Sequence, residues 1–251
     1  MKSILKSILL IPIVFLFFSF NVFAQDDCCG FGSVFGSLLQ SGIFGGYGIQ
    51  QYSPKGLNDF LADYNTETGL DFSDFGTAFG WRVGANIIQL RHDDWLIGVK
   101  LYFQSVTEAQ DQDGTYQGED ATQEFEMEID RWGFGMSFSY ILNNNFDVRI
   151  FDALLTINDI TFTNTIKSSN APPQDEFTNE TGGIGFSADA GIVWYPLPPY
   201  LSIEVLGGYS FFSIETVRDY DYDSFPTGNE DFIDGGGFFA CAVLTVGIPF
   251  N

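Results

Sequence analysis

Apolar and polar residues alternate with a period of two over much of the chain. In residues 95–104, the odd positions from Trp95 to Phe103 are large and apolar, whereas the even positions include Gly98 and Lys100. Because successive side chains of a β-strand point to opposite faces, this alternation predicts a strand with one apolar face. The same pattern predicts eight strands, at residues 43–52, 79–87, 95–104, 132–140, 146–162, 184–194, 201–210 and 238–250.

The connections between these strands alternate in length. Residues 91–94, 143–145 and 196–199 are tight turns, whereas residues 54–74, 111–122, 168–181 and 219–233 are long and polar. This order predicts an all-β fold, an eight-stranded antiparallel up-and-down β-barrel. Short turns at one end and long loops at the other are typical of transmembrane barrels of outer membranes. An even number of strands places both ends of the barrel segment at the short-turn end.

Two local features depart from simple alternation. The apolar parity changes within residues 146–162, and a β-bulge near residues 151–152 would restore it. In the first long loop, Leu57, Leu61 and Tyr64 recur at helical spacing, which predicts one short amphipathic helix. Its apolar face is expected to pack on the barrel mouth or on another loop, and a lid over the lumen is the alternative.

The polarity of the two strand faces predicts their surroundings. An eight-stranded barrel is just wide enough inside for side chains to fill, so Trp81, Phe134 and Phe186 are too bulky to share its lumen. We therefore expect the apolar face to meet lipid and the Gly- and Ser-rich face to line the lumen. Aromatic residues beside the short turns would form an interfacial girdle: Trp95, Tyr140, Phe146, Trp194, Tyr195, Tyr200 and Phe250.

Charged side chains share the inward parity. They form the predicted lumen charge network: Arg82, Lys100, Arg131, Arg149, Asp189 and Glu204, with Asp152 added if the bulge lies beside it. Because buried charges are costly unless they are paired, we predict that Lys100 and Arg82 face Glu204 and Asp189 and plug the lumen. The alternative is a narrow ion path through the same charges.

The N-terminal residues have the features of a secretory signal peptide. Lys2 and Lys6 precede an apolar stretch at residues 8–20, and Ala24 ends a small-residue cleavage site. The predicted organisation is a signal peptide at residues 1–24, a periplasmic N-terminal segment at 25–42 and the barrel at 43–251.

The last predicted strand alternates as Leu244, Val246, Ile248 and Phe250, with the aromatic next to the final residue. Together with the signal peptide and the eight strands, this motif resembles the small outer-membrane β-barrel proteins of Gram-negative bacteria, the OmpA/OmpX-like and porin-like group. The resemblance implies a multi-pass protein of the cell outer membrane, with both termini periplasmic and with outer-membrane lipid and lipopolysaccharide around it. It also implies that these four residues are recognised by the barrel-assembly machinery, and it names no specific activity.

The charge balance is strongly acidic. The chain has 33 Asp and Glu against 10 Lys and Arg, a net charge of −23, together with 28 Phe. So many aromatic residues argue against disorder, and the acidity argues against a nucleic-acid partner. Of the 33 acids, 24 lie at the long-loop end in residues 54–74, 108–130, 168–181 and 215–234. We expect these acids to form a solvated extracellular rim, whose extracellular partner the sequence does not identify.

Candidate catalytic residues are scarce. His92, the one histidine of the chain, is predicted in a tight turn, where no strand serine is expected within hydrogen-bond reach. We therefore predict no catalytic residue and no enzymatic activity. The cysteines, Cys28, Cys29 and Cys241, lack the spacing of a metal site, and their redox state stays open.

One acidic motif is a candidate calcium site. Asp219, Asp221 and Asp223 alternate, and Glu230 is the twelfth residue counted from Asp219, which matches part of an EF-hand loop. Ser224 stands where the turn glycine is expected, however, and no flanking helices are predicted. A solvated acidic loop is the simpler interpretation, and no other cofactor is expected.

Two functions remain open from the sequence. The first is a structural or surface-interaction barrel with a plugged lumen, which presents acidic loops to the medium. The alternative is a narrow cation or small-solute channel of the porin type, favoured by acidic mouths that concentrate cations. Whether the lumen is filled or open discriminates between them.

Overall fold

The computed structural model describes residues 41–168, 174–179, 182–198, 200–219, 223–226 and 231–247. The predicted signal peptide, Cys28 and Cys29 in the segment that follows it, and Ile248 and Phe250 lie outside this part, so what was inferred from them stays a prediction. Within the described part, no helix is long and apolar enough to cross a membrane.

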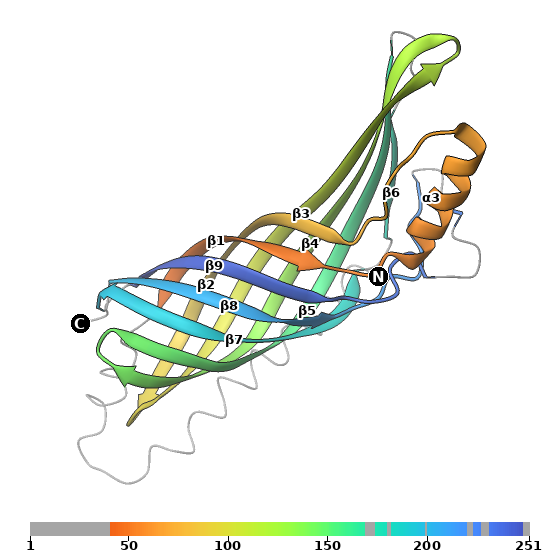
Figure 1. Cartoon of the computed structure of the whole chain (residues 1–251). Coiled ribbons are helices and arrows are strands. Elements are labelled where there is room, and N and C mark those ends of the chain that lie inside the picture. The colour runs from red at the N-terminus through yellow and green to blue at the C-terminus, as the bar shows by residue number, and fades with distance from the viewer. Residues whose placement is uncertain are drawn as a thin grey trace. The chain divides into compact units, whose positions relative to one another are not determined.

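Eight antiparallel strands close into a barrel, which confirms the predicted fold (Figure 1). They are β1 (Gly42–Gln51), β2 (Thr77–His92), β3 (Trp95–Tyr116), β4 (Glu119–Asn143), β5 (Phe146–Lys167), β7 (Gly183–Leu197), β8 (Leu201–Phe211) and β9 (Phe238–Gly247). Each strand pairs with the next in this order, and β9 pairs with β1. Because the sheet closes, alternation divides every strand into outward and inward side chains.

The predicted bulge lies in β5. The pairing of β5 with β7 shifts register between Arg149 and Asp152. As a result, both Ile150 and Phe151 face outward, with 44% and 43% of their surface exposed, whereas Asp152 returns to the lumen and is fully buried. The extra residue thus keeps the apolar side chains of both halves of the strand on the outside.

Two strands, β3 and β4, are much longer than the sequence pattern indicates, and β5 continues past its predicted end at residue 162 to Lys167. β3, β4 and β5 contain 22, 25 and 22 residues and continue beyond the other strands as a protruding sheet (Figure 1). The loop predicted at residues 111–122 is therefore wrong: β3 and β4 stay paired up to Tyr116 and Glu119, and Gln117 and Gly118, both at positive φ, make the turn. We call residues 105–116, 119–130 and 159–167 the extension. A short strand, β6 (Asp175–Thr178), pairs with its β5 edge.

An aromatic-rich core, which we call the cap, covers the inner face of the extension. Its buried members are Tyr52, Leu57, Leu61, Phe72, Phe75, Ala78, Val106, Phe125, Met127, Ile129, Ile160, Phe162, Phe212, Ile214, Val217, Phe225, Phe232 and Ile233. Strand ends and long connections both contribute to it. The connections therefore fold onto the long-loop end of the barrel, in addition to carrying solvated acids.

The predicted helix is present as α3 (Lys55–Thr68) and packs on the cap through buried leucines. Two asparagines on this helix hold the chain segment that follows it. The Asn58 amide donates to the Phe75 carbonyl and accepts from the Phe75 N–H, both at 2.9 Å. Asn65 makes the same pair of bonds with Phe72, at 2.8 and 3.0 Å. The helix is thus part of a hydrogen-bonded, packed assembly.

Candidate functional site

The outward face of the barrel is a continuous set of exposed apolar side chains, which we call the belt. Its large members are Ile43, Tyr47, Phe79, Trp81, Val83, Ile87, Trp95, Trp132, Met136, Leu142, Phe146, Ile150, Phe151, Leu155, Ile184, Phe186, Ile192, Trp194, Leu197, Tyr200, Val205, Phe211, Phe238, Leu244 and Val246. They come from every strand of the barrel. On β4 the belt ends at Trp132, and Asp130 is the next outward residue. The wall therefore has the opposite polarity to that of a water-soluble barrel.

Aromatic residues gather at the short-turn edge of the belt. Trp95, Phe146, Trp194 and Tyr200 are all more than 40% exposed there. Tyr195 is the exception among the predicted girdle residues that the structure describes, because its hydroxyl donates to Asp147 Oδ2 at 2.7 Å. Asp147 is buried at the short-turn mouth of the lumen, so Tyr195 turns inward to meet it.

Four of the lumen charges form one compact ion-pair cluster, which we call the lower layer. Lys100 Nζ lies 2.6 Å from Asp152 Oδ2 and 3.8 Å from Glu204 Oε2. Arg149 lies 3.0 Å from Glu204 and 3.6 Å from Asp152. Thr245 donates a further bond to Glu204 Oε1 at 3.0 Å. Each cation thus faces both acids, and Asp152 connects the two cations.

Two predicted arginines lie one layer further toward the cap, which we call the upper layer. Arg82 Nε and Nη2 donate to Gln104 Oε1 at 2.9 and 2.6 Å. Arg131 donates to Asn158 Oδ1 at 2.6 Å and to Gln50 Oε1 at 3.0 Å. The predicted pairing of Arg82 with Glu204 and Asp189 is therefore wrong. Its physical reason is the side-chain register: Gln104 is the cross-strand neighbour of Arg82 and offers the nearest acceptor.

A thin apolar layer separates the two charged layers. Along β3, Lys100, Tyr102 and Gln104 occupy successive inward positions, and Tyr102 packs there with Phe44 and other buried apolar residues. The Tyr102 ring lies against Gly133, where a Cβ atom would overlap it. This close approach explains a glycine at that point of β4.

Asp189 lies beside the lower layer, directly opposite Asp152 on the neighbouring strand. Its side chain is 4% exposed, and neither carboxylate oxygen has a hydrogen-bond partner. The structure therefore brings Asp189 to the predicted network without giving it the predicted direct contact with a cation.

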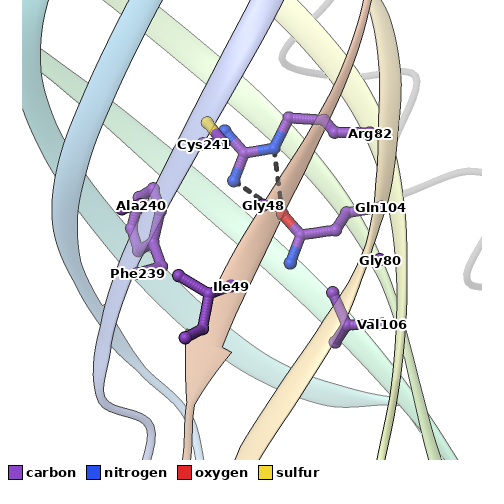
Figure 2. A pocket seen from close by; sticks show the side chains of 9 residues that line it. All are labelled: Gly48, Ile49, Gly80, Arg82, Gln104, Val106, Phe239, Ala240 and Cys241. Carbon is purple, nitrogen blue, oxygen red and sulfur yellow. Dashed lines mark hydrogen bonds between the residues drawn. The ribbon is translucent and has the colours of Figure 1, made fainter.

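The charged side chains of both layers are buried. Lys100, Arg131, Arg149 and Glu204 are each at most 3% exposed to a water-sized probe. A cavity beside Arg82, between β1, β2, β3 and β9, has room for about one water molecule (Figure 2). Arg82 and Gln104 border it, and Figure 2 shows the Arg82 guanidinium between Gln104 and Cys241.

The alternation of the sequence placed the charged side chains inside the barrel but did not identify the neutral side chains that accept hydrogen bonds from the arginines. Gln50, Gln104 and Asn158 are all buried at inward positions of β1, β3 and β5. The sequence could have indicated these partners. Their amide side chains fall at inward positions of the strands near the predicted buried arginines, and an amide oxygen accepts hydrogen bonds.

The outer face of the extension carries a row of acids, most of which the sequence assigned to the long-loop end. They are Asp111, Asp113, Glu124, Glu126, Glu128, Asp130 and Asp159. Glu128 accepts a bond from Ser105 at 2.9 Å, and Lys167 pairs with Glu124. These acids are therefore held in register on a paired sheet.

One pair of these acids makes a pH-dependent prediction. Asp130 and Asp159 are cross-strand neighbours just beyond the belt, and partial burial together with the nearby Asp130 raises the pKa of Asp159. A raised pKa in the folded state means that ionisation of Asp159 opposes folding. The stability of the folded protein therefore falls as the pH rises past the ordinary pKa of an aspartate. Asp159→Asn is expected to raise the free energy of unfolding by about 0.2–1 kcal/mol at neutral pH.

Thermal unfolding at two pH values checks this prediction. The gain should vanish at a pH well below the ordinary aspartate pKa, where Asp159 is protonated in both states. Asp120→Asn, on the same strand as Asp130 but opposite Thr115, is the matched control and should change little at either pH. A gain from Asp159→Asn that persists at acidic pH would contradict the assignment.

The other predicted site residues fall at three places. Asp219 and Asp223 lie in the connection after β8, where the Asp223 N–H donates to Asp219 Oδ1 at 2.8 Å, and Asp221 and Glu230 lie outside the described residues. Within the described part, no group of three metal-binding side chains is present, and the calcium site stays a prediction. Leu244 and Val246 belong to the belt. His92 is the last residue of β2 and is exposed, 3.9 Å from Asp93 in the turn that follows.

No protein-family model and no curated protein sequence matches the chain. Among solved structures, it is similar to Neisserial surface protein A at 10% identity and a TM-score of 0.41, over 83% of this chain and 97% of that chain. It is similar to the outer membrane protease OmpT from Escherichia coli at 10% identity and a TM-score of 0.40, over 84% and 95%. A major outer membrane protein from Thermus thermophilus matches at 9% identity and a TM-score of 0.43, over 82% and 99%.

Proposed function

We propose that this protein is a membrane-spanning β-barrel of a Gram-negative outer membrane, with a plugged lumen and an acidic surface at its long-loop end. The inverted polarity of the wall carries the proposal. Large apolar side chains such as Ile184 and Phe238 are 75% and 67% exposed outside, whereas the charged side chains of the lumen are buried. Lipid acyl chains cover such an apolar belt, and a closed barrel exposes no unpaired strand edge to the lipid.

The packed lumen supports a structural or surface-interaction role over transport. The lower layer joins four charged side chains from three strands, and the cap closes the long-loop end above the upper layer. A solute would have to break buried ion pairs and displace packed aromatic rings to pass.

The cap and the extension support the role of a presented surface. The cap holds α3 and the long connections against one face of the sheet, and the other face displays acids at fixed spacing. A surface of this kind favours partners that carry positive charge, including divalent cations beside anionic lipopolysaccharide. In this arrangement the long-loop end faces outward and both termini are periplasmic.

Conductance of the purified, refolded protein in planar bilayers tests the plugged lumen. The wild type is expected to give no reproducible single-channel steps, because the lumen charges are enclosed. Glu204→Gln removes the negative charge that pairs with Arg149 at 3.0 Å and is expected to loosen the lower layer, so any steps should be confined to this variant. Reproducible wild-type steps that Glu204→Gln alters would contradict the plugged barrel and favour a cation or small-solute channel.

A further inference from the structure

Two aspartates of the lumen lie side by side on neighbouring strands. Asp152 on β5 and Asp189 on β7 are cross-strand partners, directly after the bulge in β5. Both side chains point inward, and neither residue is more than 4% exposed. Residues directly opposite each other in an antiparallel pair have Cβ atoms about 5 Å apart, so the two carboxyl groups lie within reach of each other.

The two acids differ in the groups that they contact. Asp152 Oδ2 accepts a 2.6 Å bond from Lys100, and Asp152 Oδ1 lies 3.6 Å from Arg149 Nη1. Among the described residues, no cation lies within 4.0 Å of Asp189, and no donor completes a hydrogen bond to either of its oxygens. Asp152 Oδ1 also has no hydrogen-bond partner. The buried oxygens that lack a donor therefore belong to both members of this pair.

The charges of the lower layer balance without Asp189. Lys100 and Arg149 are paired with Asp152 and Glu204, two cations with two acids. An ionised Asp189 would add a third negative charge, buried without a donor and beside the charge of Asp152. Both conditions disfavour the ionised form. A protonated carboxyl group avoids them, because it is neutral and its O–H can donate to a neighbouring acceptor.

We propose that Asp189 is protonated in the folded barrel at neutral pH and that its O–H donates to Asp152 Oδ1. Asp152 stays the ionised member of the pair, because it alone contacts Lys100 and Arg149. The lumen thus contains a binding site for one proton, enclosed among ion pairs. This inference goes beyond the proposed function and does not rest on where the barrel resides.

Charged or titratable side chains surround Asp189 on five other strands. They are Asp152 and Arg149 on β5, Lys100 on β3, Arg82 on β2, Glu204 on β8 and Cys241 on β9. Of the three cations in this set, only Arg82 bonds to a neutral acceptor, and its charge attracts both aspartates. Arg82 belongs to the upper layer, however, beyond the apolar layer that contains Tyr102. The competing arrangement is an ionised Asp189 that acts as a distant counter-charge to Arg82.

Infrared spectroscopy of the full chain, refolded in detergent micelles at neutral pH, detects the proton directly. The wild type is expected to show the carbonyl stretch of a protonated carboxylic acid, which Asp189→Asn should lack. Labelling the aspartate carboxyl carbons with ¹³C should shift this band, which identifies it as an aspartate even if the variant does not refold. Asp120→Asn, a change at an exposed acid of β4, is the control and should keep the band. Wild-type and Asp189→Asn spectra that agree in this region, or no such band in the wild type, would overturn the proposal.

The dependence of stability on pH tests the same proton independently. Asp189 is ionised in the unfolded chain at neutral pH, so folding takes up a proton there and stability falls as the pH rises. Above the ordinary pKa of an aspartate, the equilibrium constant for unfolding should therefore increase up to tenfold more per pH unit in the wild type than in Asp189→Asn. The Asp120→Asn control should keep the wild-type slope. Equal slopes in the wild type and Asp189→Asn, with the variant less stable at neutral pH, would instead identify Asp189 as an ionised counter-charge.

Discussion

Asp152→Ala is expected to destabilise the folded barrel by about 3–5 kcal/mol, one of the two largest effects of any single substitution proposed here. Asp152 is fully buried, accepts the 2.6 Å bond from Lys100 and lies 3.6 Å from Arg149. Its removal leaves two buried cations with Glu204 as their shared partner. The free energy of unfolding, from reversible urea titration in detergent or lipid, measures the loss.

A double variant distinguishes this network effect from a general loss of packing. Lys100→Met combined with Asp152→Asn removes both partners of the shortest ion pair of the lower layer and should cost clearly less than the sum of the two single changes. Asp120→Ala, exposed near the tip of the extension, is the control acid and should stay within about 0.5 kcal/mol of the wild type. Strictly additive losses would contradict a coupled lower layer.

Phe162→Ala is expected to cost about 3–5 kcal/mol through the cavity that it leaves in the cap. Phe162 is fully buried, and five aromatic rings lie with centroids 5.2–6.5 Å from its own. Because the cap lies at one end of the molecule, the damage should be local. Limited trypsin digestion should cut at Lys167 and Arg218 in the variant while the barrel strands stay protected.

A belt residue is the matched control for this change. Phe186→Ala removes the same atoms from the outward face, where Phe186 is 44% exposed, and it leaves no internal cavity. Its cost should be less than half that of Phe162→Ala, and its digestion pattern should match the wild type. Equal costs at the two positions would mean that the cap is not a packed core.

The barrel was predictable because its two faces meet different surroundings. Where large apolar residues alternate with small ones, as in Trp132 to Tyr140, the period of two is plain in the sequence. The extension was not predicted, because residues 111–122 are polar on both faces and resemble a loop. A usable signal lay just beyond, where Phe125, Met127 and Ile129 alternate with glutamates, and it marks the face that the cap covers.

The sequence predicted which charged side chains line the lumen, but not which cation pairs with which acid. Parity assigns Lys100 and Glu204 to the inside, and the structure brings them within 3.8 Å. Which cation meets which acid depends on strand register and on the bulge in β5, and neither is fixed by alternation alone. Arg82 shows the consequence, because a register neighbour, Gln104, takes the place of the acids expected opposite it.

The proposed function requires a lipid-facing belt around a closed lumen. A nitroxide scan along β4 in lipid bilayers tests both parts in a background without native cysteines. Labels at Phe134, Met136 and Phe138 are expected to be accessible to oxygen dissolved in the lipid and protected from a water-soluble relaxation agent. Labels at Asp130 should show the reverse, and a label at the buried Ser137 should be shielded from both. Protection of the three outward positions from oxygen, or access of the water-soluble agent to Ser137, would contradict the proposed function.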